Sequence, residues 1–190
     1  MTQVVLVRHG ATEWSRTGRH TGRTDVPLEE PGRDAARRLG PALAGWTFAS
    51  TVTSPLSRAA ETAALAGFGG ATRDPRLQEW HYGTAEGRTT VDMRATDPSW
   101  SVWTSPMVEG ETIEEVAARV DEVVEELRQA AGPVLVFAHG HLLRILAARW
   151  LGLDPHWGRA LLLDPATISL LGTDRGTAVI ERWNAPISAP

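Results

Sequence analysis

Short apolar runs alternate along the chain with longer stretches in which apolar residues recur at helical spacing. Val4–Val7 and Val134–Ala138 are continuous apolar runs, which is typical of strands buried on both faces of a sheet. Ser50–Thr53 and Ala71–Arg73 are shorter strand candidates between them. Because helical patterns separate these strands, we predict an α/β fold with three layers, in which helices cover a mostly parallel central sheet.

Four segments carry the helical pattern. The first helix is expected to run from about Glu30 to Ala44, with Pro31 in its first turn and a kink near its end because of Pro41. The second helix is expected to begin at Pro55 with Ser54 as its N-cap and to reach about Ala66. The other two run from the capping box at Thr112 to about Ala131, and from about Leu142 to Leu151.

Two polar segments lack a regular pattern. Residues 10–30 are expected to form a long loop directly after the first strand, and such loops are usually functional. Residues 88–111 hold Trp100 and Trp103 and are read either as a cap over a substrate crevice or as a surface segment packed by its tryptophans.

The carboxyl-terminal part predicts two closing strands, Thr167–Leu171 and Ala178–Trp183, with a turn at 173–176 and a loose tail over Asn184–Pro190. No linker, repeat or low-complexity segment divides the chain. We therefore expect residues 1–190 to form a single domain, with 88–111 as its cap.

The composition narrows the function. Hydrophobic residues make up 42% of 190 residues, which is ordinary for a globular protein, and the net charge of −4 argues against a nucleic-acid surface. No apolar run is long enough to span a membrane and no signal peptide precedes the first strand, so we expect a cytoplasmic protein. The chain has no cysteine and no lysine, which excludes thiolate chemistry and a P-loop lysine.

The dipeptide His-Gly follows two of the predicted strands. It occurs as His9-Gly10, after Arg8, beyond the first apolar run, and as His139-Gly140, before His141, beyond the second. Ligands of open α/β sheets bind beyond the carboxyl ends of parallel strands, so both histidines are expected to face one crevice. Gly10 is expected to allow close approach of the backbone to a ligand.

Further charged residues are expected near this crevice. Arg58 falls in the first turn of a helix, where an arginine is unfavourable without an anionic partner. Trp80 would desolvate Glu79 and favour its protonated form, as a general acid needs. Arginines and helix amino ends together favour a phosphoryl group, on which a histidine can act as nucleophile while a carboxylic acid protonates the leaving oxygen.

With these residues in this order, the sequence resembles the phosphoglycerate mutase-like branch of the histidine phosphatase superfamily. Five segments carry the resemblance in order: Arg8–Trp14, Thr21 to Leu28, Ser54–Ala63, Leu77–Gly87 and Ala138–His141. One departure is Ser15, where the family usually has Asn.

The resemblance implies a phosphoglycerate mutase-like fold and a small phosphorylated metabolite as substrate, with no cofactor and no metal. It implies His9 as the phosphorylated nucleophile and Glu79 as proton donor. It implies a phosphate clamp of Arg8, Arg58 and His139. The further phosphate or substrate contacts would be Ser15, Thr21, Gly22, Gly140 and His141.

Three other readings stay open from the sequence. A cofactor-dependent phosphoglycerate mutase is disfavoured because Glu79 and His139 are only 60 positions apart, which favours an open pocket and hydrolysis. A zinc site of His9, Glu79, His139 and His141 is disfavoured by the flanking arginines. A non-catalytic module that binds a phosphorylated ligand is the third reading. The sequence leaves open whether the chain forms a homodimer. Our prediction is a phosphomonoesterase similar to the family's small acid phosphatases.

Overall fold

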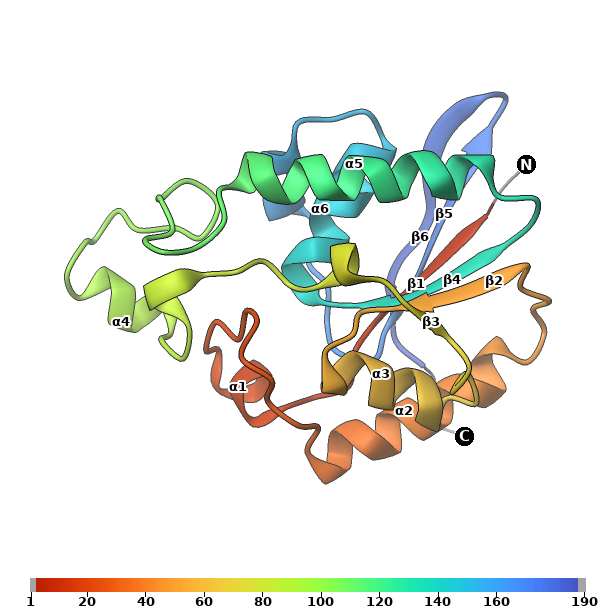
Figure 1. The fold of residues 1–190 in the computed structure, drawn as a ribbon, viewed down its shortest axis with the longest axis horizontal. Coiled ribbons are helices and arrows are strands. Elements are labelled where there is room, and N and C mark those ends of the chain that lie inside the picture. Colours follow the sequence, from red (N-terminus) through yellow and green to blue (C-terminus); the bar gives the residue numbers. More distant parts are fainter. Residues whose placement is uncertain (1–2, 188–190) are drawn as a thin grey trace.

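The computed structural model describes residues 3–187, which contain a six-stranded sheet in the order β3-β2-β4-β1-β5-β6 (Figure 1). β1 to β4 are mutually parallel, and β5 and β6 form an antiparallel hairpin at one edge. The mixed, mostly parallel sheet with helices on both faces confirms the predicted fold class. The strands are β1 Val4–Arg8, β2 Ser50–Thr53, β3 Thr72–Arg73, β4 Val134–Ala138, β5 Ile168–Asp174 and β6 Thr177–Ala185.

The register of the two central strands determines where the site lies. β1 pairs with β4 from Val4 opposite Val134 to Arg8 opposite Ala138. Because the two strands are parallel and in step, His9 and His139 leave the sheet at the same edge.

Helices cover both faces of the sheet (Figure 1). α5 Ile113–Gln129 and α6 Gly140–Trp150 pack on one face, while α2 Glu30–Leu43 and α3 Ser57–Leu65 pack on the other. The strands supply both cores by alternation: Leu6 belongs to the first core and Val7 to the second. This confirms that the continuous apolar runs are strands buried on both faces.

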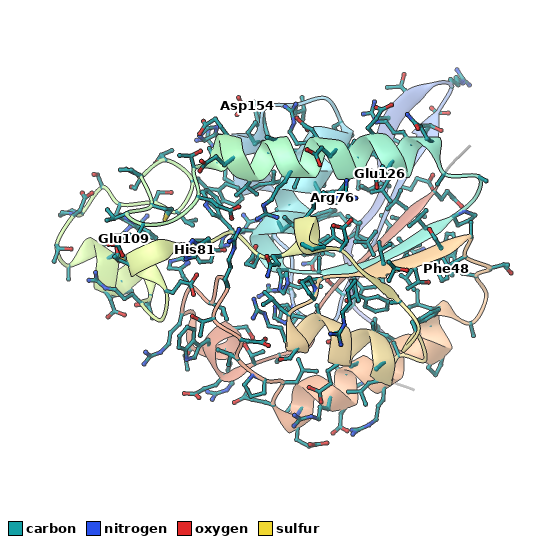
Figure 2. The ribbon with its side chains drawn as sticks, in the orientation of Figure 1. Phe48, Arg76, His81, Glu109, Glu126 and Asp154 are labelled. Atoms are coloured by element: carbon teal, nitrogen blue, oxygen red, sulfur yellow. The ribbon has the colours of Figure 1, made fainter. Side chains whose placement is uncertain are left out.

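α5 begins at the predicted capping box, since the Thr112 side chain accepts from the Glu115 N–H and the Glu115 carboxylate accepts from the Thr112 N–H. Further along α5, Glu126 lies within 2.7 Å of Arg76, an ion pair between the helix and the segment beneath it (Figure 2). The Arg76–Glu126 pair joins α5 to the segment that leads into Glu79.

The predicted start of α3 was wrong. The helix begins at Ser57 with Leu56 as N-cap, and Ser54 does not cap it. Asp25 from a distant loop caps it instead, accepting from the Ser57 N–H at 3.0 Å and from the Ser57 hydroxyl at 2.8 Å. A local pattern cannot predict a cap that comes from 32 positions away.

α2 runs through Pro41 to Leu43, in agreement with the predicted range. A proline removes one backbone hydrogen bond, and here it does so on the exposed side of the last turn. The buried Leu39 and Leu43 on the opposite side keep that turn packed on the sheet.

The polar loop of residues 10–30 contains a short helix that the sequence reading missed, α1 Glu13–Thr17. The region 88–111 contains one short helix, α4 Thr90–Arg94. Both lie together beyond the end of the sheet (Figure 1), joined by a bridge between Arg19 and Thr89. The short 3-10 helices are Pro75–Leu77, Gly83–Ala85 and Pro155–Ala160.

The carboxyl-terminal hairpin was predicted with strands that are too short. β5 and β6 are joined at Arg175 and Gly176, which both have positive φ angles, as a two-residue hairpin turn requires. β6 continues to Ala185, so the predicted tail begins only after it, and its last residues, 188–190, lie outside the described range. Within residues 3–187 no helix combines the length and apolar character that crossing a membrane requires.

Candidate active site

His9 follows β1 and lines a cavity at the sheet edge. Its Nδ1 lies 2.7 Å from the Gly10 carbonyl oxygen, which can only accept, so Nδ1 carries the proton. The lone pair of a neutral ring is then on Nε2. Burial, followed by the charges of Arg58 and Arg8, lowers the pKa of His9 well below 6.5, which keeps the ring neutral.

Gly10 is required by its neighbours in the chain. A Cβ at this position would lie 2.4 Å from the Gly32 carbonyl oxygen at the start of α2. The Gly10 N–H donates to the Thr62 hydroxyl at 3.0 Å. The absence of a side chain at Gly10 therefore allows the start of α2 to pack closely against it.

His139 lies beside His9, with 5.2 Å between the ring centroids. Arg58 Nε donates to its Nδ1 at 3.2 Å, so the neutral ring carries its proton on Nε2, which donates to the Ser54 hydroxyl at 2.7 Å. His139 is fully buried and lies behind the cavity wall rather than on it. Burial and the charge of Arg58 lower its pKa well below 6.5.

The Arg58 side chain is 0% exposed, and it organises the loop between α1 and α2. It donates to the Gly22 carbonyl at 2.7 Å and to the Thr24 carbonyl at 2.9 Å. Glu86 holds the same loop by accepting from the N–H groups of Arg23 and Thr24. Gly22 has a φ of +56°, and a Cβ there would collide with the Glu86 carboxylate at 1.9 Å. The guanidinium of Arg58 lines the cavity, and the two backbone carbonyls hold it in a fixed position there.

Arg8 is the cation with an unused buried donor. Its Nη1 donates to the Leu163 carbonyl, while its Nε is buried and has no hydrogen-bond partner within the described part of the chain. A buried N–H without a partner costs free energy unless a ligand completes it. The Arg8 guanidinium also lies against Gly140, where a Cβ would be 3.2 Å from Cζ.

Glu79 is 6% exposed and lies against the amino end of α6. Its carboxylate accepts from the N–H groups of Trp80 at 3.0 Å, Leu142 at 2.9 Å and His141 at 3.1 Å. Trp80 is buried beside it, as predicted, and the three backbone donors hold the carboxyl group in place. The His141 N–H is thereby engaged by Glu79.

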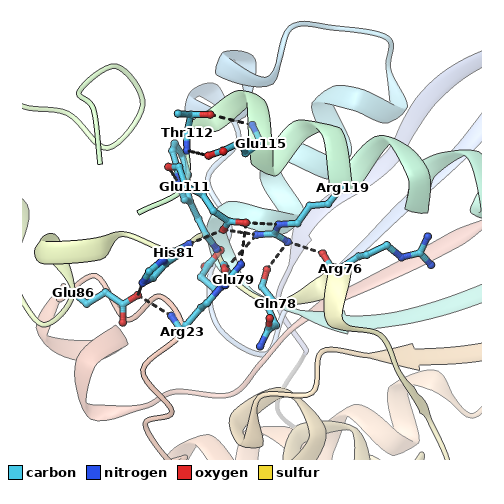
Figure 3. A network of polar contacts seen from close by, with 11 residues as sticks. Arg23, Arg76, Gln78, Glu79, His81, Glu86, Glu111, Thr112, Glu115 and Arg119 are labelled. Carbon is cyan, nitrogen blue, oxygen red and sulfur yellow. Dashed lines mark hydrogen bonds and ion pairs between the residues drawn. The ribbon is translucent and has the colours of Figure 1, made fainter. Parts of the chain in front are cut away.

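A network of polar contacts holds the Glu79 segment (Figure 3). From α5, Arg119 donates to the Gln78 carbonyl at 2.8 Å and the Glu79 carbonyl at 3.3 Å. The same guanidinium pairs with Glu111 at 3.0 Å. Glu111 also accepts from Arg23 Nη2 at 3.0 Å. Glu111 therefore connects the segment that carries Glu79 to the loop held by Arg58.

The cavity has a volume of about 370 Å³. Ser15 lines it, but its hydroxyl already donates to the Thr12 carbonyl at 3.0 Å as part of the α1 cap. Gly22 contributes through its carbonyl to Arg58 rather than to the wall. Most other predicted site residues line it as well: Arg8, His9, Thr21, Arg58, Glu79, Gly140 and His141.

The profile of the histidine phosphatase superfamily (branch 1) matches residues 4–186. The chain belongs to this superfamily. An acid phosphatase from Mycobacterium tuberculosis is 35% identical over 178 residues, covering 92% of this chain and 88% of that protein. A probable phosphoglycerate mutase from Photorhabdus laumondii is 30% identical, with 96% and 90% covered.

The fold agrees with this membership. The solved structure of an open reading frame product from Mycobacterium tuberculosis superposes with a TM-score of 0.94 at 33% identity, covering 98% of this chain and 99% of that one. Membership of this superfamily, together with a similar acid phosphatase, shows that the chain is an enzyme that hydrolyses phosphate esters. The predicted enzyme class is confirmed.

The sequence reading of this histidine phosphatase missed several residues around the site. Ser54 was assigned to a helix cap but bonds to His139, and Thr62 supports Gly10. Tyr82 hydrogen-bonds to His141 from the same segment as Glu79. Thr62 and Tyr82 could have been singled out from the sequence, because both lie within segments that resemble the family.

The alternative of a metal site does not fit these side chains. Both ring nitrogens of His139 are engaged, and Glu79 accepts three backbone donors. Among residues 3–187 no group of three or more His, Cys, Asp or Glu side chains is arranged to hold a metal ion. The donors that line the cavity, including the guanidinium groups of Arg8 and Arg58, suit an anion rather than a metal cation.

Proposed function

We propose that this histidine phosphatase hydrolyses small phosphate monoesters through a phosphohistidine on His9. The observation that carries the proposal is the tautomer of His9: Gly10 holds its Nδ1–H, so Nε2 presents a lone pair at a cavity lined by Arg8 and Arg58. A neutral imidazole is the form that can attack phosphorus.

The proposed reaction has two steps. The Nε2 lone pair of His9 forms a bond to phosphorus while the P–O bond to the alcohol breaks, and the protonated Glu79 gives its proton to the leaving oxygen. A water molecule then attacks phosphorus, Glu79 takes its proton, and the P–N bond breaks to release phosphate. Hydrogen bonds to the other phosphoryl oxygens stabilise both transition states.

We assign the phosphoryl clamp to Arg8, Arg58 and His139. Arg8 supports this role with its unpaired buried Nε, and Arg58 with its fixed guanidinium. His139 would act from behind the wall, through its contact with the His9 ring. The further proposed phosphate or substrate contacts are Ser15, Thr21, Gly22, Gly140 and His141.

The segment 88–111 is the proposed substrate cap. It contributes Thr90, Arg94, Ser101, Val102 and Trp103 to the cavity wall, which supports a role in selecting the alcohol part of the ester. A cavity of about 370 Å³ suits a small metabolite.

Two assays test the proposal against a mutase and against a non-catalytic module. We expect release of phosphate from a panel of esters to be faster than isomerisation of 3-phosphoglycerate. His9→Ala is expected to abolish turnover, while the matched control His156→Ala, outside the cavity, retains it. Faster isomerisation would make the chain a mutase, and equal, negligible turnover in all three proteins would make it a binding module.

A further inference from the structure

Glu86 lies outside the wall of the cavity, yet its carboxylate is built into the loop that holds Arg58. Its side chain is 13% exposed and follows the 3-10 helix Gly83–Ala85. Oε1 accepts from the Arg23 N–H at 2.9 Å, and Oε2 accepts from the Thr24 N–H at 2.9 Å. The Thr24 hydroxyl also donates to Oε2. Figure 3 shows this carboxylate directed toward Arg23.

The loop is fixed from its outer side. The Glu86 carboxylate fills the space that a side chain at position 22 would need, and Gly22 leaves that space open. The Arg23 guanidinium is held separately by Glu111. Residues 22–24 are therefore fixed through their backbone by one carboxylate and through a side chain by another.

The inner side of the same loop holds Arg58. Its Nη2 donates to the Gly22 carbonyl and its Nη1 to the Thr24 carbonyl. The Gly22 carbonyl and the Arg23 N–H belong to a single peptide unit. Glu86 thus accepts from one end of a peptide group whose other end accepts from Arg58. Hydrogen bonds in such a chain polarise and strengthen one another.

Arg58 depends on these carbonyls because it is a buried cation. No carboxylate of residues 3–187 forms a hydrogen bond with it: Asp25 lies 3.8 Å from Nη1 and accepts from the Ser57 N–H instead. Burial lowers the pKa of Arg58, while nearby carboxylates, among them Glu86, act in the opposite direction. The direction of the guanidinium is therefore determined by where the loop carbonyls lie.

We propose that Glu86 is a positioning residue for Arg58: it holds the backbone of residues 22–24 where the loop carbonyls direct the guanidinium toward a bound phosphoryl group. Glu86 does not touch the substrate itself. The inference rests on the proposed function, in which Arg58 binds phosphoryl oxygens. It adds that a carboxylate outside the cavity sets the strength of that binding.

Glu86→Gln tests the proposal with little change in shape. The amide nitrogen would face an N–H donor, so one of the two acceptors is lost. We expect kcat/KM for 4-nitrophenyl phosphate to fall, and the inhibition constant of inorganic phosphate to rise, by about tenfold, as for lost hydrogen bonds to a charged group. Glu114→Gln, at an exposed position of α5, is the matched control and should leave both constants unchanged.

Two comparisons separate positioning from a general loss of structure. Partial unfolding would lower kcat by reducing the active fraction, but it would not change the inhibition constant of phosphate. The phosphoryl group is common to all esters, whereas proton donation matters most for poor leaving groups. We therefore expect Glu86→Gln to reduce kcat/KM by the same factor for an alkyl phosphate and for 4-nitrophenyl phosphate.

A double-mutant cycle assigns the effect to Arg58. Arg58→Lys keeps a positive charge but cannot bind both loop carbonyls. Adding Glu86→Gln to Arg58→Lys should change the inhibition constant of phosphate by less than about twofold, because the two substitutions act on one interaction. Thr24→Val removes only the hydroxyl bond to Glu86 and should cause a smaller loss of the same kind. It decides the test if Glu86→Gln does not fold.

Two results would overturn the inference while the proposed function stands. One is a wild-type inhibition constant for phosphate in Thr24→Val and in Glu86→Gln. The other is a full, additive effect of Glu86→Gln in the Arg58→Lys background. If the wild type hydrolyses neither 4-nitrophenyl phosphate nor any other ester, the proposed function itself fails and the role of Glu86 fails with it.

Discussion

At the scale of single residues, the chemistry of the site depends on which nitrogen of each ring carries the proton. The Gly10 carbonyl fixes His9 with a free Nε2, and Arg58 fixes His139 with its proton on Nε2. The motif around His9 predicted that this residue is central. It could not predict the tautomers, because these depend on partners that the fold brings from other segments.

Gly10→Ala tests how tightly this position is packed. The added Cβ would lie 2.4 Å from the Gly32 carbonyl oxygen, so the start of α2 must move. We expect the free energy of unfolding in urea to fall by about 1–3 kcal/mol, as for overpacked sites. Gly45→Ala, where a Cβ meets no atom within 4 Å, should stay within about 0.5 kcal/mol of the wild type. Equal stability of the two variants would show that the Gly10 site tolerates a side chain.

At the scale of elements, two helices hold the segment that carries Glu79. The amino end of α6 donates two N–H groups to the Glu79 carboxylate, and Arg119 of α5 binds the backbone around it. The sequence predicted both helices and the motif of Glu79. It did not single out Arg119, because the backbone carbonyls that this side chain binds lie about 40 positions away.

Arg119→Lys is expected to impair the proton donor more than the nucleophile. A lysine cannot reach the backbone carbonyls and Glu111 together, so the Glu79 segment loses its brace. We expect kcat/KM to fall about tenfold or more for an alkyl phosphate, whose leaving oxygen needs a proton, and less for 4-nitrophenyl phosphate. Arg149→Lys is the control and should affect both esters alike. An equal loss for both esters in Arg119→Lys would assign Arg119 a merely structural role.

At the scale of the whole molecule, the order and direction of the strands bring the site together. The apolar runs predicted β1 and β4 and their common edge, and the structure bears this out in the pairing of Arg8 with Ala138. The helix cap from Asp25 and the extension of β6 to Ala185 were not predictable, because each depends on contacts with chain segments far away in the sequence.

The histidines around the site make the stability of the whole molecule sensitive to acid. Burial is the leading cause that lowers the pKa values of His9, His20, His139 and His141 below 6.5. The unfolded chain therefore binds protons at these residues first, so their contribution to stability is complete above pH 6.5 and is lost progressively below it. We expect Tm to fall between about pH 7 and pH 5, a range above most carboxyl pKa values. A constant Tm over this range would contradict the buried, neutral histidines.

Trapping the intermediate tests the central claim most directly. The enzyme is mixed with a ³²P-labelled ester, quenched within one turnover under alkaline conditions, and digested for mapping of the labelled peptide. We predict label on the peptide that contains His9, and none in His9→Ala. Label on another residue, or turnover without any labelled protein, would contradict a phosphohistidine at the end of β1.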